Sequence, residues 1–141
     1  MRHSHTRIWI HLIWATKNRE RCLFKQAGQP LYDHFLEKAK ELGIPFERLN
    51  IQPEHVHTLI DLPTDKCLSE FMKAIKGESA HWMNQNRFIS GHFEWQRGYG
   101  GYSVSASQVD IVKSYIQNQT PIINIKPLPK SMRNGNTGME F

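Results

Sequence analysis

The chain has 141 residues, of which 39% are apolar and 22% charged, so it can form one domain with a core, and no apolar run is long enough to span a membrane. Eighteen Lys and Arg against thirteen Asp and Glu give a formal net charge of +5, which suits a polyanionic partner without identifying one. Cys22 and Cys67 show no CxxC spacing, which leaves zinc-ribbon and redox motifs unsupported and makes a reducing cytoplasm the expected setting.

The N-terminal segment predicts a strand over residues 6–16 that ends in a basic cluster. His11 interrupts its apolar stretch, and KNRER follows in place of a small-residue cleavage site, so the segment does not read as a signal peptide. His3 and His5 precede this strand with a spacing that could bind a metal, but no strand pattern flanks them. We expect no chemistry from that first pair.

The remaining pattern alternates between helices and strands. We expect helices over residues 29–42, 68–87 and 108–119, and strands over 44–52, 55–62 and 93–106, the last with a glycine interruption. The order βαββαβ predicts an α+β fold of the ferredoxin-like or RNA-recognition-motif-like type, with an antiparallel sheet, two helices on one face and an additional C-terminal helix. Residues 1–120 would form a single domain, and residues 121–141, rich in Pro and Asn, an extended or disordered tail.

Two histidines share one face of the strand over residues 55–62. Period-two alternation puts His55 and His57 on the same side, while Val56 between them faces the core. Such a pair could bind a metal ion, although two polar residues on a solvent-facing strand are the alternative interpretation.

The C-terminal helix brings two more polar groups together. Val109, Val112 and Ile116 form its apolar stripe, and Tyr115 and Gln119 lie one turn apart on another face, where they can serve one site. A half-buried core aromatic is the alternative interpretation of Tyr115.

In combination, these segments resemble the single-tyrosine HUH transposases, small enzymes of IS200-like insertion sequences that cut and rejoin single-stranded DNA, and their REP-associated relatives. The resemblance runs from residue 6 to residue 119, through RIWIHLIWATKNRER, the histidine strand, LSEFMKAIKGESAHWMN, WQRGYGGYSVSASQ and YIQNQ. It implies that Tyr115 is the nucleophile and that His55, His57 and Gln119 bind a divalent metal, Mg²⁺ or Mn²⁺. It also implies hairpin-ended single-stranded DNA as substrate, a 5′-phosphotyrosine intermediate and a homodimer, with no nucleotide cofactor.

Basic residues in three segments could bind the DNA backbone. Single basic clusters are usually ordinary solvated surface, but together with Trp82, Trp95, Tyr99 and Tyr102 they predict a track for a single strand. The residues are Lys17, Arg19, Arg21, Lys73, Lys76 and Arg97.

Two other functions stay open at this level. The tail TPIINIKPLPKSMRNGNTGMEF departs from the family pattern, so a domesticated or degenerate hairpin-binding protein without productive transposition is the main alternative. An RNA-processing two-histidine phosphoesterase would need two separated HxT or HxS motifs, and the sequence has these only at the wrong offsets.

Overall fold

The computed structural model describes residues 5–119, so the expected tail over 121–141 and His3 lie outside the described residues. Three α-helices, four strands and two short 3-10 turns occur in this part of the chain. Their order is β1 (Trp9–Ala15), η1 (Lys17–Arg19), α1 (Lys25–Glu41), β2 (Arg48–Ile51), β3 (His55–Asp61), α2 (Leu68–Asn86), β4 (Gly100–Ser103), η2 (Ala106–Gln108) and α3 (Val109–Asn118).

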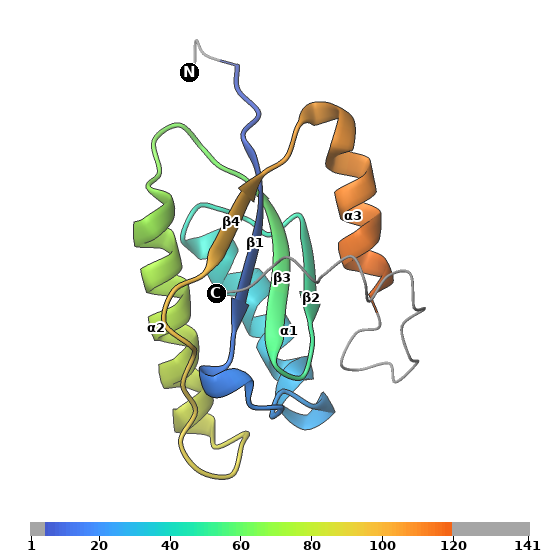
Figure 1. The fold of residues 1–141 in the computed structure, drawn as a ribbon. Helices are drawn as coiled ribbons and strands as arrows, with labels where there is room; N and C mark the ends of the chain where they lie inside the picture. Colours follow the sequence, from blue (N-terminus) through green and yellow to red (C-terminus); the bar gives the residue numbers. More distant parts are fainter. Residues whose placement is uncertain (1–4, 120–141) are drawn as a thin grey trace.

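The four strands form one antiparallel sheet in the order β2-β3-β1-β4. Helices α1 and α2 cover one face, and α3 lies on the other face over β2 and β3 (Figure 1). The register pairs Ala15 with His55, Ile13 with His57 and His11 with Leu59. The predicted α+β, ferredoxin-like arrangement with an additional C-terminal helix is confirmed.

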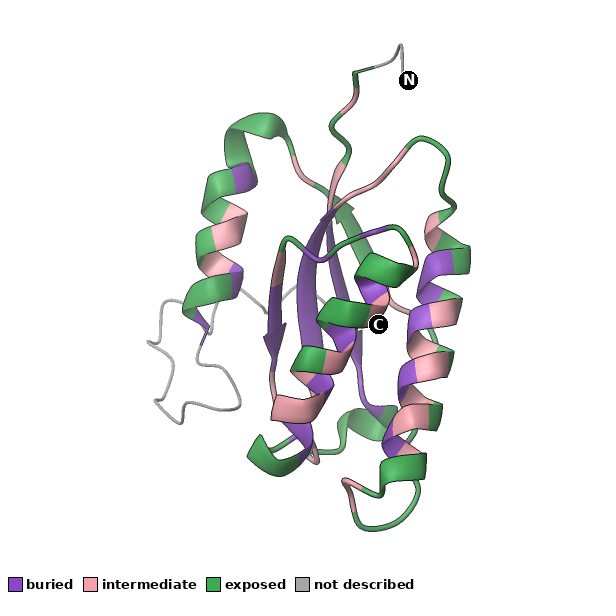
Figure 2. Cartoon of the chain, turned by 180° about the vertical axis from the view of Figure 1, so that it is seen from behind, coloured by how far each residue is buried: buried purple, intermediate pink, exposed green. Residues whose placement is uncertain are grey.

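The sheet has a different hydrophobic cluster on each face. Leu12, Trp14, Val56 and Ile60 point toward α1 and α2 and are fully buried in the main core, which Figure 2 shows between the sheet and these helices. On the opposite face, α3 covers a smaller cluster of Leu59, Val109 and Ile116, so the predicted apolar stripe of this helix is confirmed. Alternation along β3 therefore sends Val56 into one cluster and leaves the histidines on the side of α3.

Several elements have different bounds from those predicted. Helix α1 begins at Lys25, before the predicted start at residue 29, and contains Pro30. The expected strand over 93–106 forms only β4, because the preceding segment pairs with the sheet through an isolated bridge between Trp95 and Thr16 and then turns at Gly98, with φ of 83°. None of the helices among residues 5–119 combines the length and apolarity that crossing a membrane requires.

Candidate active site

His55 and His57 lie at the start of β3, on the face covered by α3. His57 is fully buried, and His55 is 8% exposed. Their Nε2 atoms are 2.6 Å apart, so the two imidazoles converge on one point. The predicted placement of both rings on one side of the strand, with Val56 in the main core, is confirmed.

The second ring nitrogen of each histidine also has a partner. Nδ1 of His55 is 2.7 Å from a carboxylate oxygen of Glu54, which also pairs with Arg21 at 2.8 Å. Nδ1 of His57 is 3.3 Å from Nε2 of His11 on β1. A row of three imidazoles and one carboxylate therefore runs across the sheet beneath α3.

Burial keeps the deeper imidazoles neutral. It lowers the pKa of His57 well below 6.5, with smaller contributions from the positive charges that His55, His11 and Arg19 can carry. Burial also lowers the pKa of His11 to about 4. The hydrogen bond from His55 lowers the pKa of Glu54, so this carboxyl group is ionised at neutral pH. Neutral imidazoles are the form that binds metal ions.

Tyr115 of α3 points toward these rings. Its ring centroid is 6.1 Å from that of His57 and 6.4 Å from that of His11, both edge to face. Burial raises the pKa of the Tyr115 phenol above its usual 10, and the nearby Gln119 side chain partly opposes this shift. The buried hydroxyl lies next to the Gln119 side chain and has no other polar partner among residues 5–119.

Gln119 follows directly after α3 and is fully buried. Within the described residues, its side-chain amide has no polar partner besides Tyr115. A buried polar group left unpaired costs about 1–3 kcal/mol, so a further polar partner beside Tyr115 and Gln119 would be stabilising. A bound cation or a phosphate would supply it.

The end of α3 is held against the sheet of the same chain. The Asn50 side-chain amide donates to the Gln119 backbone carbonyl at 2.9 Å, and Asn50 is itself buried. Arg48 Nε donates to Gln117 Oε1 at 3.1 Å. Tyr115 therefore lies against the histidines of its own chain.

These side chains fit a divalent cation. Two Nε2 ligands at about 2.1 Å from one ion, at right angles, are about 3 Å apart, so the present 2.6 Å separation would need to widen by only a few tenths of an ångström. The side-chain oxygen of Gln119 offers a harder ligand, and mixed imidazole and oxygen donors suit Mn²⁺. No three His, Cys, Asp or Glu side chains are arranged to hold a metal ion anywhere in residues 5–119, so an amide ligand is needed to complete a three-residue set.

Comparison with known proteins identifies the family of the chain. The family model described as "Transposase IS200 like" matches residues 4–119. The chain belongs to this family. ISDra2 transposase TnpA of Deinococcus radiodurans is 28% identical to this IS200-like transposase over 114 residues, which cover 77% of this chain and 81% of the relative.

Solved structures agree with this assignment. A Deinococcus radiodurans protein described as a transposase matches with a TM-score of 0.67 and 29% identity, covering 84% of this chain and 95% of that one. A REP-associated tyrosine transposase bound to a REP hairpin matches with a TM-score of 0.59 and 18% identity, covering 82% and 68% of the two chains. The second match supports the fold alone.

Some of the basic residues predicted to bind DNA have ion-pair or hydrogen-bond partners within this transposase, and others are exposed. Lys17 pairs with Glu94 at 2.9 Å, and Arg21 pairs with Glu54. Lys76 donates to the backbone carbonyls of Gln96 and Gly98 at 2.8 and 2.7 Å. Lys73 and Arg97 are exposed, on α2 and in the segment before β4. The contacts of all these residues with DNA stay a prediction.

Arg19 is a basic residue whose charge reaches the site without a direct ion pair within residues 5–119. It is exposed, makes no ion pair with the residues that the structure describes, and influences the pKa values of both His57 and Glu54. Its backbone has φ of 53°, in the left-handed region, at the end of the η1 turn. The aromatic residues predicted to stack on bases are mostly internal: Trp95 is buried, Trp82 and Tyr99 pack against the core, and Tyr102 is 39% exposed.

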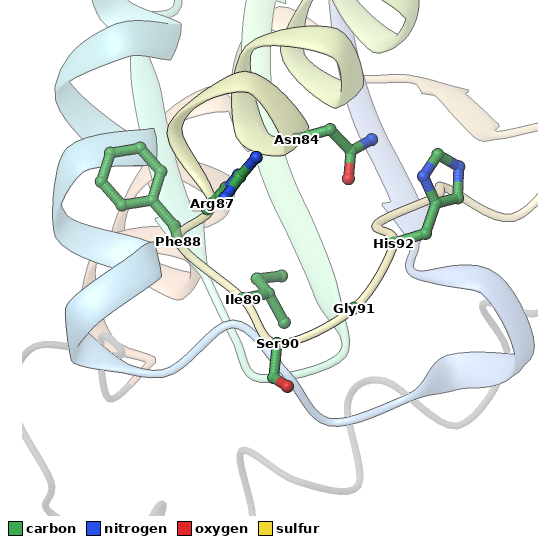
Figure 3. Close-up of a pocket in the computed structure, with 7 residues that line it drawn as sticks. All are labelled: Asn84, Arg87, Phe88, Ile89, Ser90, Gly91 and His92. Carbon is green, nitrogen blue, oxygen red and sulfur yellow. The ribbon is translucent and has the colours of Figure 1, made fainter.

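A shallow pocket of about 610 Å³ lies away from these groups, at the loop that follows α2. Asn84 and residues 87–92 line it, and Figure 3 shows the loop curving below the end of α2 with Arg87 and His92 among the bordering side chains. None of the His, Tyr or Gln residues described above contributes to it. We therefore assign no part of the site chemistry to this pocket.

Sequence analysis missed two residues of the site, His11 and Glu54. The missed signal for His11 is its position in the apolar run WIHLIW, where a buried polar side chain requires a partner across the sheet. Glu54 directly precedes the histidine strand, so a carboxylate next to a candidate metal-binding histidine was visible in the sequence.

Proposed function

We propose that this IS200-like transposase is a metal-dependent single-strand DNA transposase that recognises hairpin ends, cuts through a 5′-phosphotyrosine at Tyr115 and rejoins strands. The observation that supports the proposal is the buried Tyr115 phenol, which has Gln119 beside it and lies against His57, whose Nε2 meets that of His55. Buried groups that act on a phosphodiester can complete their polar contacts when substrate and cation bind.

The roles of the residues follow from phosphoryl-transfer chemistry. Tyr115 Oη would attack the phosphorus in line, form a phosphotyrosine with the 5′ end and displace the 3′ oxygen, which leaves as a hydroxyl. A 3′ hydroxyl of another strand would reverse this step and release the tyrosine, so the energy of the broken bond is retained for joining. When bound, Mg²⁺ or Mn²⁺ held by His55, His57 and Gln119 supplies Lewis-acid stabilisation of the phosphate oxygens.

Loss of the phenol proton is the demanding part of the attack. Because burial raises the pKa of Tyr115, little phenolate exists at neutral pH in the free protein. We infer that bound substrate phosphate and cation assist the departure of this proton. Arg19, in the segment that Arg21 joins to Glu54, provides positive charge for the DNA backbone on the approach to the site.

Hairpin recognition and a homodimer complete the proposal. The REP-associated tyrosine transposase that shares the fold is bound to a REP hairpin, and the positive net charge of the present chain suits such a ligand. β4 is an edge strand of the described sheet, so its outer side can pair with the sheet of a second copy. Sedimentation equilibrium measures this association directly.

The deciding experiment uses 5′- and 3′-labelled oligonucleotides that span the hairpins flanking the gene, incubated with Mn²⁺, Mg²⁺ or chelator. A denaturation-resistant adduct on the strand 3′ of the cut is expected with metal and not with chelator. Tyr115→Phe should abolish the adduct with hairpin binding nearly intact, while Tyr32→Phe on α1, remote from the site, should keep it. The His55→Ala, His57→Ala double variant should lose metal-dependent cleavage, and His81→Ala, an exposed histidine of α2, should not.

Other results would change the assignment. An adduct that persists in Tyr115→Phe would place the nucleophile elsewhere, and undiminished cleavage by the double histidine variant would remove the metal site. Tight hairpin binding by the wild-type chain without any adduct would identify a degenerate DNA-binding protein of the same fold.

A further inference from the structure

His11 is a buried titratable residue that the proposed mechanism does not use. It lies on β1 opposite Leu59 in the register, is 4% exposed, and faces the same side of the sheet as His57. Its Nε2 is 3.3 Å from His57 Nδ1, the nitrogen that points away from His55. His55 likewise has a partner at its Nδ1, the carboxylate of Glu54.

The contact between the two imidazoles has the geometry of a hydrogen bond. The rings are within 19° of parallel, but their centroids are 5.5 Å apart, which is the spacing of two imidazoles joined nitrogen to nitrogen and not that of rings stacked face to face. The Tyr115 ring lies at a steep angle to both imidazoles. His11 is therefore held where one of its ring nitrogens meets one of those of His57.

The positions of the protons in the free protein follow from the carboxylate. Glu54 can only accept, so neutral His55 carries its proton on Nδ1 and has a bare Nε2. The 2.6 Å contact then requires His57 to donate from Nε2, which leaves its Nδ1 bare. His11 must consequently donate from Nε2 to His57. Each of the three imidazoles has one defined tautomer.

Binding of a cation between the Nε2 atoms of His55 and His57 requires a different set of tautomers. Both Nε2 atoms must then be bare, so the proton of His57 moves from Nε2 to Nδ1. This proton needs an acceptor, and the atom in place is His11 Nε2, which is bare only when the proton of His11 is on Nδ1. No proton is gained or lost, and the hydrogen bond between His11 and His57 reverses its direction.

We propose that His11 is a positioning residue for the cation site, which exchanges its ring tautomer so that His57 Nδ1 donates to it and His57 Nε2 is free to bind the metal. This inference rests on the proposed function, because it assumes that His55 and His57 bind the cation. An imidazole suits the role because the same nitrogen can donate in one state and accept in the other. Lys could only donate there, and an ionised Glu could only accept.

The first test measures Mn²⁺ affinity from the electron paramagnetic resonance signal of the free ion, in the full chain without DNA. His11→Gln places an amide that can rotate to donate or accept near the position of Nε2, whereas His11→Asn has the same chemistry but is one carbon too short. We expect Asn, and likewise His11→Leu, to weaken Mn²⁺ binding about 10- to 100-fold, the usual cost of losing an outer partner of a metal-binding histidine. The Gln variant should remain within a few-fold of wild type.

The second test needs no variant that could misfold. Ring-nitrogen spectra of ¹⁵N-histidine-labelled wild-type chain at pH 8 distinguish protonated from bare Nε2, and Zn²⁺ serves as a diamagnetic probe that imidazole binds well. His11 should change from a proton on Nε2 to a proton on Nδ1 as Zn²⁺ is added. A His11 that keeps its proton on Nε2 while His55 and His57 bind Zn²⁺ would overturn the inference.

The outcomes separate this inference from the proposed function. If the wild type binds Mn²⁺ and loses it in His55→Ala, but the Asn and Leu variants of His11 bind as well as wild type, only the role of His11 is wrong. If wild type and His55→Ala bind Mn²⁺ equally weakly, the metal site itself is absent, and both proposals are overturned.

Discussion

His57 and His11 are both buried, although they lie on different strands. Alternation along one strand was enough to place His55 and His57 together, because both belong to the same local period. His11 is 46 positions away from His57 in the chain, and only the register of β1 against β3 brings the two rings together. Local pattern could therefore predict the pair of histidines but not the residue that contacts His57 from the neighbouring strand.

Burial of these imidazoles predicts that the protein loses stability in mild acid. The folded-state pKa of His11 is about 4, below the 6.5 of an unfolded histidine, so the unfolded chain binds more protons below pH 6.5. The free energy of unfolding should fall as the pH falls from about 6.5 to about 4, by ~3 kcal/mol for this group, and be fully retained above 6.5. The low pKa of His57 acts in the same direction.

Urea unfolding in the presence of chelator measures this effect at pH 7.5, 6, 5 and 4.5. His11→Gln removes one of the two groups, so its free energy of unfolding should decline less steeply with acid than that of wild type. Parallel pH profiles for the two proteins would show that His11 does not titrate with a lowered pKa.

At the level of elements, helix and strand types were predictable, whereas some bounds depended on tertiary contacts. The segment before β4 was expected to be strand, but the Lys76 ammonium, reaching from α2, binds the carbonyls of Gln96 and Gly98. Carbonyls held by a side chain do not need a neighbouring strand. No pattern within residues 93–106 contains that information, because the donor belongs to another helix.

Helix α3 is attached to the sheet by a small cluster, which predicts that it can loosen without global unfolding. Ile116 is fully buried against Leu59, while Ile111 of the same helix is 60% exposed. Ile116→Ala removes buried contacts worth about 2–5 kcal/mol and should chiefly weaken the docking of α3. We expect faster amide hydrogen exchange in residues 109–118, unchanged protection of β1 and β3, and a lower yield of the Tyr115 adduct.

Ile111→Ala is the matched control, since it makes the same chemical change on the solvent side of the helix. It should leave both exchange and adduct yield near the wild-type values. Equal effects of the two variants, or loss of protection throughout the sheet in Ile116→Ala, would contradict an independently docked helix.

For the whole molecule, the order of the elements was sufficient to predict the topology. The charges in the sequence did not reveal which Lys and Arg side chains are free to bind DNA. Of the six basic residues predicted to bind DNA, Lys17, Arg21 and Lys76 have partners within the chain. These ion pairs and hydrogen bonds join residues far apart in sequence, so a count of charges overstates the free positive surface. Arg19 is exposed, has no ion-pair partner within residues 5–119, and lies near the candidate active site.

The last prediction concerns the dependence of hairpin binding on salt. Each phosphate neutralised by Lys or Arg releases counterions, so the logarithm of the binding constant should fall linearly with the logarithm of salt concentration. Arg19→Ala should weaken hairpin binding and reduce this slope by about 1, as expected for the loss of one phosphate contact. Lys38→Ala is the control, because Lys38 lies on α1, pairs with Glu41 at 3.0 Å and should not alter the slope. Fluorescence anisotropy between 50 and 300 mM salt measures both variants, and an identical slope for Arg19→Ala and wild type would exclude Arg19 from the DNA track.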